Sequence, residues 1–290
     1  MNESIFQKAI DLSNTGRWVL HVIGATEMKR FLFPLLMLLL PGFAAAQSPF
    51  DGTWVVKPEA TQLPRSPEVY ALYNGIYECG SCVPKIKANA DGKDYPVAGS
   101  PYFSAIAIRV VDDHAIELIE KQKEKVVYKE LDKVSADGGT LQQDITDLAA
   151  PNGQEVVAQV TFKRVGMGPA GSNAVAGSWL AQKIRFLSEN GITVTYHGTA
   201  QRLEASNPGG EGYAAKFDGK EYPVNGDPAH STVSLKKINA NTIVETDRQD
   251  GKVHYMLRMT VSRDGKMMKV IERDEERGTK TTYVLEKKPA

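Results

Sequence analysis

Hydrophobic and polar residues alternate along many short segments of this chain. One such segment, near the C-terminus, places hydrophobic side chains at every second position: Val253, Tyr255, Leu257, Met259 and Val261. The same alternation puts Val233 and Leu235 on one side of a second segment, and Ile106 and Ile108 on one side of a third. Side chains of a β-strand point alternately to opposite faces, so the pattern predicts half-buried strands.

Tight-turn sequences separate these segments. Asp-Gly pairs begin at positions 51, 91, 137, 218, 250 and 264, and Asn-Gly pairs begin at 74, 152, 190 and 225. Such pairs tolerate the positive φ angles of two-residue hairpin turns. The pattern therefore predicts an all-β fold of antiparallel meanders. Closing each meander into a barrel would leave no exposed edge strand.

The chain contains two copies of one unit. Residues 91–99 return as residues 218–226, with seven of the nine positions identical. Each copy has the size of an independent domain. We therefore predict two tandem β-barrels, a first at residues 47–165 and a second at residues 176–290, joined by a linker at residues 166–175.

The predicted linker contains the sequence G-x-G-x-x-G at residues 166–171. A dinucleotide-binding loop of this form needs a following helix, because the helix N-terminus holds the pyrophosphate. The start of the second copy, around Trp179, follows here instead. We therefore interpret these glycines as a linker and not as a nucleotide site.

A targeting signal precedes the first copy. Met28-Lys29-Arg30 is followed by an apolar run at residues 31–40 and by alanines at residues 44–46. The run is too short to cross a bilayer, which takes about 20 residues, and its flanks are typical of a secretory signal peptide. We predict a signal peptide over residues 1–46, with residues 1–27 as a spurious extension ahead of the true start. The product is then exported, either periplasmic or extracellular.

Charge narrows the range of partners. Lys plus Arg total 35 and Asp plus Glu total 35, so no surplus of positive charge is available for a phosphate backbone or an anionic membrane. No Cys follows residue 46 closely enough to accept a lipid. We expect no nucleic-acid partner and no stable membrane anchor, and the sequence indicates no particular protein partner.

Each copy carries a G-x-W motif on its first expected strand, at residues 52–54 and 177–179, and Arg164 and Lys287 or Lys288 stand near the ends of the copies. These features resemble the lipocalin and wider calycin barrels, in which the Trp closes the barrel floor and a basic residue of the last strand packs on it. The chain also resembles a group of exported bacterial proteins, mostly uncharacterised, with D-G-K-x-Y-P-V in each copy and Y-x-C-x-x-C in the first. The resemblance implies calycin-like barrels and brings no established activity.

Cys79 and Cys82 are the two cysteines of the chain. Their C-x-x-C spacing suits a redox dithiol, half of a metal site or a local disulfide. A redox pair would use a helix N-terminus, whereas the surroundings indicate strand and turn. The interval 74–91 is shorter than the interval 190–218 in the second copy, so we expect one strand fewer here and a disulfide that staples the connection. Thiol–disulfide redox activity is the third functional alternative.

Motifs of enzymes and metal sites are absent from the sequence after residue 46. It contains no H-E-x-x-H, no G-x-S-x-G and no EF-hand loop. His197, His230 and His254 all fall in the second copy, and the first copy has Phe103 and Val127 opposite two of them. Scattered surface histidines explain this better than a shared metal site. We predict no catalytic residue, no metal and no cofactor.

Two acidic residues conflict with the predicted strand parity. Glu130 and Asp132 stand where the second copy has Leu257 and Met259, on the face expected to point inward. A bulge that turns Leu131 inward would remove the conflict. Without that bulge, the first barrel has an acidic interior suited to a cationic ligand.

We expect an exported protein that is not an enzyme and that holds a small apolar or amphipathic ligand in its barrel cavities. The alternative is a structural or partner-binding envelope protein whose barrels are filled by their own side chains. The candidate interior residues are Trp54, Ile106, Ile108, Tyr128, Glu130, Asp132, Trp179, Val233, Leu235, Tyr255, Leu257 and Met259.

Overall fold

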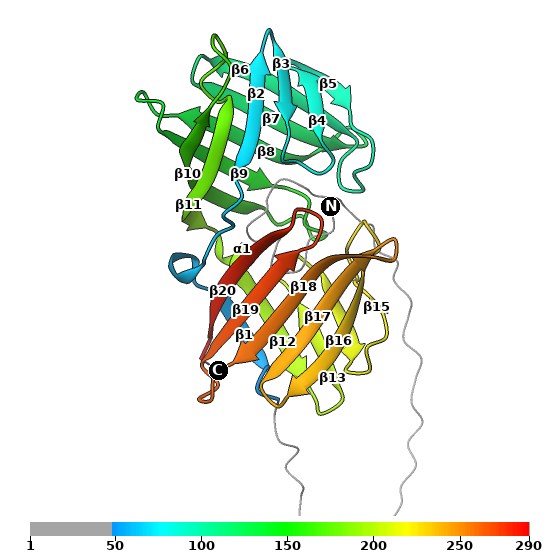
Figure 1. Cartoon of the computed structure of the whole chain (residues 1–290). Coiled ribbons are helices and arrows are strands. Elements are labelled where there is room, and N and C mark those ends of the chain that lie inside the picture. The colour runs from blue at the N-terminus through cyan, green and yellow to red at the C-terminus, as the bar shows by residue number, and fades with distance from the viewer. Residues whose placement is uncertain (1–47, 290) are drawn as a thin grey trace, which may run out of the picture.

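The computed structural model describes residues 48–289, so the predicted signal peptide at residues 1–46 lies outside the described residues. Twenty strands dominate this part of the chain, with two short helical turns, η2 (Pro58–Ala60) and α1 (Glu189–Ile192). The strands form two ten-stranded antiparallel sheets, each curled into a nearly closed barrel (Figure 1). The prediction of an all-β fold with two antiparallel barrels is confirmed.

The first barrel uses one continuous part of the chain. In sheet order its strands are β4 (Ile86–Asn89), β3 (Ile76–Cys79), β2 (Glu68–Tyr73), β11 (Gly177–Leu187), β10 (Val156–Met167), β9 (Thr140–Asp147), β8 (Lys125–Val134), β7 (Ala115–Gln122), β6 (Ala105–Asp112) and β5 (Asp91–Pro96). Most neighbours in the sheet are also neighbours along the chain. The hairpin signals in the sequence thus produce the expected meander.

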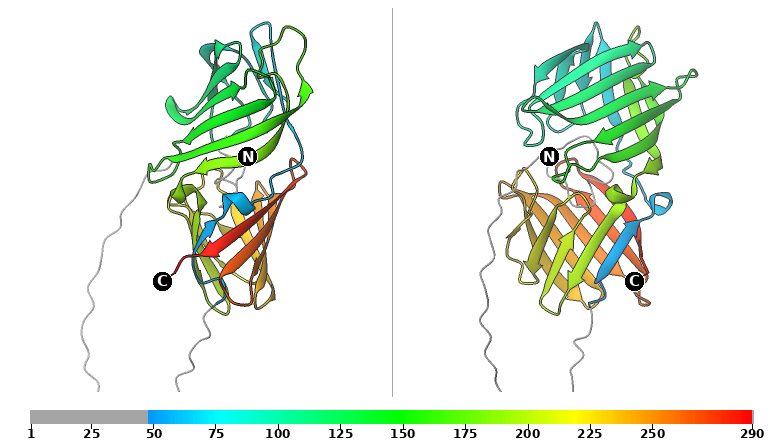
Figure 2. Two further views of the ribbon diagram at one scale, coloured as in Figure 1. Left: turned by 90° about the vertical axis from the view of Figure 1, so that its left-hand side faces the viewer. Right: turned by 180° about the vertical axis from the view of Figure 1, so that it is seen from behind.

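The second barrel uses two separate parts of the chain. In sheet order its strands are β14 (Gly212–Lys216), β13 (Arg202–Ser206), β12 (Thr193–Gly198), β1 (Gly52–Val56), β20 (Thr279–Lys287), β19 (Met267–Asp274), β18 (Lys252–Val261), β17 (Thr242–Gln249), β16 (Thr232–Asn239) and β15 (Tyr222–Pro223). Figure 2 shows β1, in blue, among the yellow to red strands of this barrel. The first barrel is therefore inserted between β1 and β12 of the second.

The two G-x-W strands are exchanged between the copies. β1, from the first copy, pairs with β12 and β20 of the second. β11, from the second copy, pairs with β2 and β10 of the first. The division into residues 47–165 and 176–290 therefore describes the sequence repeat and not the barrels. The repeat could not reveal this, because both strands carry the same motif and each fits the same place in either barrel.

Residues 166–175 form the end of a hairpin and not a linker between barrels. β10 continues to Met167, which pairs with Gly177 of β11. The barrels are joined instead by residues 57–67, between β1 and β2, and by residues 188–192, between β11 and β12. The G-x-G-x-x-G sequence is thus followed by a strand of the same sheet.

The Trp of each exchanged strand is part of the core of the barrel that receives it. Trp54 and Trp179 are both 0% exposed. Each indole Nε1 donates a hydrogen bond to the carbonyl oxygen four residues earlier, at 2.7 and 2.8 Å. The guanidinium of Arg164 lies 4.0 Å from the ring centre of Trp179, and Nζ of Lys287 lies 5.4 Å from that of Trp54. Each Trp is therefore packed against a basic residue from the last strand of the other sequence copy.

The glycine of each G-x-W motif makes room for that basic side chain. A Cβ atom on Gly177 would lie 2.5 Å from Nη1 of Arg164, and one on Gly52 would lie 2.6 Å from Cε of Lys287. Both glycines also have positive φ angles, +142° and +118°, which residues with a side chain rarely adopt. The motif thus has a physical explanation, since the glycine admits the cation and the Trp receives it.

Candidate functional site

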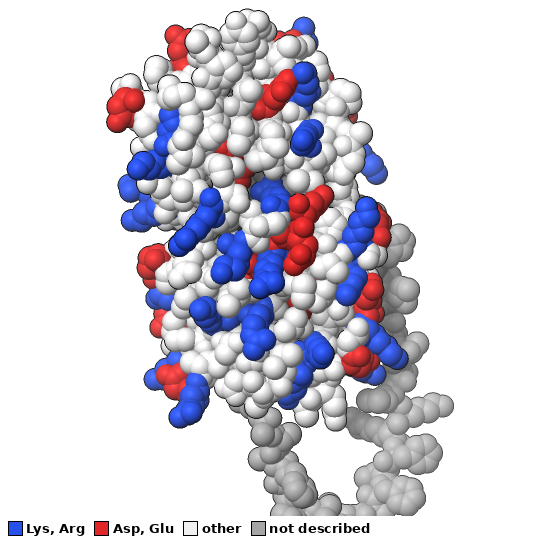
Figure 3. Space-filling model, in the orientation of Figure 1, with Lys and Arg blue, Asp and Glu red and all other residues white. Residues whose placement is uncertain are grey.

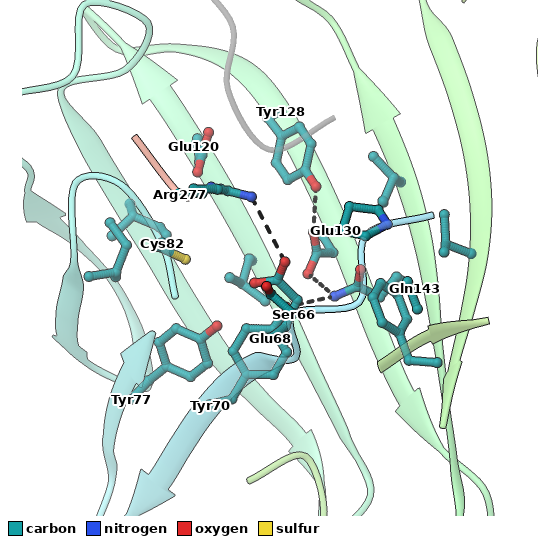
Figure 4. A pocket seen from close by; sticks show the side chains of 18 of the residues that line it. Ser66, Glu68, Tyr70, Tyr77, Cys82, Glu120, Tyr128, Glu130, Gln143 and Arg277 are labelled. Carbon is teal, nitrogen blue, oxygen red and sulfur yellow. Dashed lines mark hydrogen bonds and ion pairs between the residues drawn. The ribbon is translucent and has the colours of Figure 1, made fainter. Parts of the chain in front are cut away.

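The first barrel contains a cavity of about 140 Å³, shown from close by in Figure 4. Part of its wall is apolar and is formed by Ile86, Ile106, Leu118, Ile145, Val160 and Phe162. Other parts are polar and include Tyr70, Tyr77, Glu120, Tyr128, Glu130 and Gln143. The cavity therefore offers both apolar surface and hydrogen-bonding groups to a bound molecule.

A hydrogen-bond network organises the polar wall. The hydroxyl group of Tyr128 donates to Oε2 of Glu130. Nε2 of Gln143 donates to Oε1 of Glu130 at 3.0 Å and to the hydroxyl oxygen of Tyr70 at 3.3 Å. Figure 4 shows these groups converging from β2, β8 and β9. Both oxygens of Glu130 thus accept hydrogen bonds from neutral donors.

Glu130 and Asp132 both point into the first barrel. They are 8% and 0% exposed, and β8 pairs with β9 without a shift over this stretch. The bulge of this strand lies earlier, at Val127, where the pairing with β7 shifts by one residue. The expected bulge that turns Leu131 inward is therefore wrong. The alternative, an acidic interior, is what the structure contains.

Asp132 has a buried carboxyl group whose two oxygens make no hydrogen bond within the described part of the chain. Burial, followed by the charge of the neighbouring Glu130, raises the pKa of Asp132 well above its usual value. Both effects act because the charged form loses its hydration and is repelled by a like charge. Asp132 therefore retains its proton at pH values at which an exposed Asp has lost it.

One side chain of the second barrel contributes to the wall of this cavity. Arg277 lies in the turn between β19 and β20, and its Nη1 is 3.8 Å from Oε1 of Glu68 on β2. Its Nε is 4.0 Å from Oδ2 of Asp274 in its own hairpin. Among the described residues that line the cavity, the charged ones are Arg277, Glu68, Glu120 and Glu130. Three carboxyl groups and one guanidinium group thus line the cavity.

All the residues predicted to face the barrel interiors are buried, namely Trp54, Ile106, Ile108, Tyr128, Glu130, Asp132, Trp179, Val233, Leu235, Tyr255, Leu257 and Met259. The structure brings Ile106, Tyr128 and Glu130 together in the cavity wall. Trp54 belongs to the core of the second barrel and Trp179 to that of the first, the reverse of the predicted placement. The strand exchange is the reason.

Other lining residues were missed by the sequence analysis. Tyr70 and Tyr77 flank the Asn74-Gly75 turn, and their rings stack with centroids 6.1 Å apart. The turn and the alternation on either side could have identified this hairpin and its inward face. Arg277 carries no such signal, because its place in the cavity depends on how the two barrels pack.

The interior of the second barrel is filled by its own side chains. The large side chains that are at most 1% exposed there include Tyr196, Tyr255, Leu257, Met259, Met268 and Tyr283. Four carboxyl groups are also buried there, those of Glu245, Asp247, Glu272 and Asp274. The two barrels share a fold and differ in what occupies their interiors.

A tyrosine–carboxyl pair fills one part of the second interior. The hydroxyl group of Tyr283 donates to Oε1 of Glu272 at 3.0 Å. In the strand register, Val160 and Ile145 take these two positions in the first barrel. Both line the cavity. The first barrel therefore has a smaller apolar pair where the second has a phenol ring and its acceptor.

A second pair differs in the same way. The hydroxyl group of Tyr213 donates to Glu245 in the second barrel, and Ile86 and Leu118 take these positions in the first. Both apolar residues again line the cavity. At both pairs of positions the first barrel thus has smaller side chains on the cavity wall than the second barrel has in its interior.

Burial sets the protonation of Glu245. It raises the pKa of Glu245 from 4.5 to about 7, and hydrogen bonds from Tyr213 and Asp247 partly oppose this shift. The folded protein therefore holds a proton on Glu245 in a pH range in which the unfolded chain has released it.

The free energy of unfolding should consequently fall as the pH rises from about 4.5 to 7, with a contribution from Glu245 of about 3 kcal/mol. The free energy of unfolding falls, and does not rise, because the folded state binds more protons than the unfolded state in this pH interval. We expect Glu245→Gln, which keeps an acceptor for Tyr213, to reduce this fall in the free energy of unfolding. Urea unfolding of the unaltered protein and of the variant at pH 5 and pH 8 measures the fall in each. An equally large fall in the variant would contradict this assignment.

Cys79 and Cys82 form a disulfide, as predicted, with their Cα atoms 5.4 Å apart. The expectation of a missing strand at this place is wrong, because β2, β3 and β4 correspond to β12, β13 and β14. The intervals 74–91 and 190–218 do not start at equivalent places, because Asn74 follows β2, whereas Asn190 precedes β12. The disulfide links the end of β3 to the following turn, where Cys82 lines the cavity.

The histidines lie apart from the cavity. Nδ1 of His197 is 3.7 Å from Oδ1 of Asp51, and Nδ1 of His254 is 3.2 Å from Oε2 of Glu276. Within residues 48–289, no group of three His, Cys, Asp or Glu side chains could hold a metal ion. Over the same residues, no helix has the length and apolar character needed to span a membrane.

The outer surface mixes both signs of charge. Figure 3 shows basic and acidic side chains on the visible face of each barrel. On that face, the charges form no field of one sign over a whole barrel. No family model matches the chain, and no curated protein sequence is similar to it.

Proposed function

We propose that this protein is a non-enzymatic binding protein that holds a small amphipathic molecule in the cavity of its first barrel. The observation that carries the proposal is the cavity of about 140 Å³, at positions that the second barrel fills with two tyrosine–carboxyl pairs. An apolar cavity of about 150 Å³ engineered into another protein binds benzene. The ligand is then about the size of one small ring or a short alkyl chain.

The proposed place of action is outside the cytoplasm. A signal-peptide pattern at residues 1–46 and the Cys79–Cys82 disulfide both support it, because disulfides persist in oxidising compartments. Periplasm and extracellular space are equally compatible with these features.

A structural role is the second candidate, and it applies to the second barrel. Its filled interior supports this role, with Leu257 and Met259 both 0% exposed. This barrel also supplies Arg277 to the cavity wall of the first. In this proposal one barrel binds the ligand, and the other supports it and completes the rim of the cavity.

Filling the cavity tests the binding proposal. We expect Val160→Phe to abolish binding of n-butanol and n-butylammonium, because the new ring occupies the space that Tyr283 fills in the second barrel. Isothermal titration calorimetry in a buffer without amines measures binding. The melting temperature should stay equal or rise, since filling a cavity adds packing without a buried hydroxyl group.

Val165→Phe is the matched control, because Val165 lies on the same strand, β10, and is 53% exposed. It should leave binding unchanged. Binding that survives Val160→Phe in a folded protein would place the ligand elsewhere. If the unaltered protein bound neither probe, the proposed function would be wrong.

A further inference from the structure

The charge of the cavity wall indicates what kind of molecule fits, if the proposed function is right. The described lining residues include the carboxyl groups of Glu68, Glu120 and Glu130 and the guanidinium group of Arg277. Arg277 lies between Glu68 and Asp274 of its own hairpin, at 3.8 and 4.0 Å. The wall therefore has more acidic than basic groups, and an anionic ligand would meet repulsion.

Glu130 is the carboxyl group best placed to contact a ligand. It lines the cavity and is only 8% exposed. Its oxygens accept hydrogen bonds from Tyr128 and Gln143, which fix the direction of the carboxylate. A carboxylate held in this way accepts a strong, charge-assisted hydrogen bond from an ammonium group.

Asp132 lies next to this carboxyl group. It is two residues from Glu130 on the same inward face of β8 and is 0% exposed, and it does not itself line the cavity. Glu130 is therefore the carboxyl group of β8 that a ligand in the cavity would contact.

Aromatic rings also line this part of the cavity. Tyr70 and Tyr77 stack with their ring planes 25° apart, and Tyr128 lies beside Glu130. The faces of tyrosine rings attract cations within about 6 Å. Carboxylate and aromatic faces together are a common chemistry for holding organic ammonium groups.

The two copies differ in which strands carry their buried carboxyl groups. In the second barrel, Leu257 and Met259 take the positions of Glu130 and Asp132, and that interior is filled. The second interior is acidic as well, because Glu245 and Glu272 lie beside Leu257 on β17 and β19, and each accepts a hydrogen bond from a tyrosine, Tyr213 or Tyr283. The first barrel differs in that a carboxyl group of β8, Glu130, lines a cavity.

We infer that the ligand is a small organic monocation, an amine in its ammonium form with a short apolar group. Its ammonium N–H groups donate to the carboxylate of Glu130. Its apolar group lies against Leu118, Ile145 and Val160, in the space that tyrosine side chains fill in the second barrel. The cavity of about 140 Å³ limits the apolar group to a few carbon atoms or one ring.

Three probes of one shape test the charge preference: n-butylammonium, n-butanol and butyrate. We expect n-butylammonium to bind about tenfold more tightly than n-butanol, because a hydrogen bond to a charged group contributes more than a neutral one. Butyrate should bind more weakly than either. In Glu130→Gln, which removes the charge and keeps one acceptor oxygen for Tyr128 or Gln143, the preference for n-butylammonium over n-butanol should disappear, while n-butanol binding stays within about twofold.

Glu245→Gln is the matched control, since Glu245 is a buried carboxyl group bonded to a tyrosine in the other barrel. It should leave the preference intact. Equal binding of n-butylammonium and n-butanol, or a preference that survives Glu130→Gln, would overturn the inference and leave the proposed function standing. Absence of binding by all three probes would overturn both.

Discussion

A fragment of residues 57–192 is expected to fold as an isolated barrel, whereas a fragment of residues 47–165 is not. The first fragment contains β2 to β11 and therefore every strand of the first barrel. The second contains one complete sequence copy but lacks β11. It carries instead β1, which belongs to the other barrel.

The expected difference is large because β11 contributes to both the sheet and the core. It supplies Trp179, Ile184 and Leu187, which are at most 8% exposed. Truncating a buried Trp alone costs about 3 to 5 kcal/mol, against a total stability of about 5 to 15 kcal/mol for a typical domain. Removing β11 also leaves β2 and β10 with unpaired edges, which promote aggregation.

Circular dichroism and urea unfolding distinguish the two fragments. Residues 57–192 should give a strand spectrum and one cooperative transition, and residues 47–165 should give neither. The longer fragment retains all described cavity-lining residues except Arg277, so it also shows whether that side chain affects ligand binding. The strand exchange would be contradicted if residues 47–165 unfolded cooperatively and their free energy of unfolding fell as steeply with urea as that of the complete barrel.

The sequence could predict the fold class because its signals are local. Alternation, tight turns and the repeat between residues 91–99 and 218–226 each depend on short stretches of chain. The strand exchange depends on which of two equivalent strands, β1 or β11, takes the same place in each of the two sheets. Trp54 and Trp179 have the same local sequence signal, so only the pairing of β1 with β12 and β20 distinguishes their barrels.

Strand parity predicted inward faces except where a bulge interrupts the strand. Leu257 and Met259 are buried as expected, but Val253 is 36% exposed. The pairing of β17 with β18 shifts at His254, which turns the preceding residue outward. The first copy has the same bulge at Val127, so this feature is common to both barrels and invisible in the alternation.

The candidate site could be predicted only in part. Parity indicated that Glu130 faces inward, and the structure places it in the cavity wall. The cavity itself depends on which residues meet across the barrel, such as Val160 near Ile145 in place of Tyr283 and Glu272. Such contacts join residues far apart in sequence, so a single sequence without pairing information does not reveal them.

Replacing Leu257 with Asp is expected to destabilise the second barrel by more than about 4 kcal/mol. Leu257 is 0% exposed, and its direct neighbours on β17 and β19 are Glu245 and Glu272. The new carboxyl group would lose the packing of a buried leucine, at a cost of about 2 to 5 kcal/mol. It would also lie between two buried carboxyl groups, and burying it without a positive partner adds several kcal/mol.

Thr260→Asp is the control on the same strand. Thr260 is partly exposed and lies directly opposite Lys269, so a carboxylate there should change stability by no more than about 0.5 kcal/mol. In a protein that begins at Gln47 and so lacks Trp18, the fluorescence of Trp54 reports on the second barrel once Trp179 is replaced by Phe, because Trp54 lies in that core. Urea unfolding followed by this signal measures both variants in the same background. Equal stability of the two variants would mean that Leu257 does not face a packed interior, and the description of the second barrel as filled by its own side chains would then be wrong.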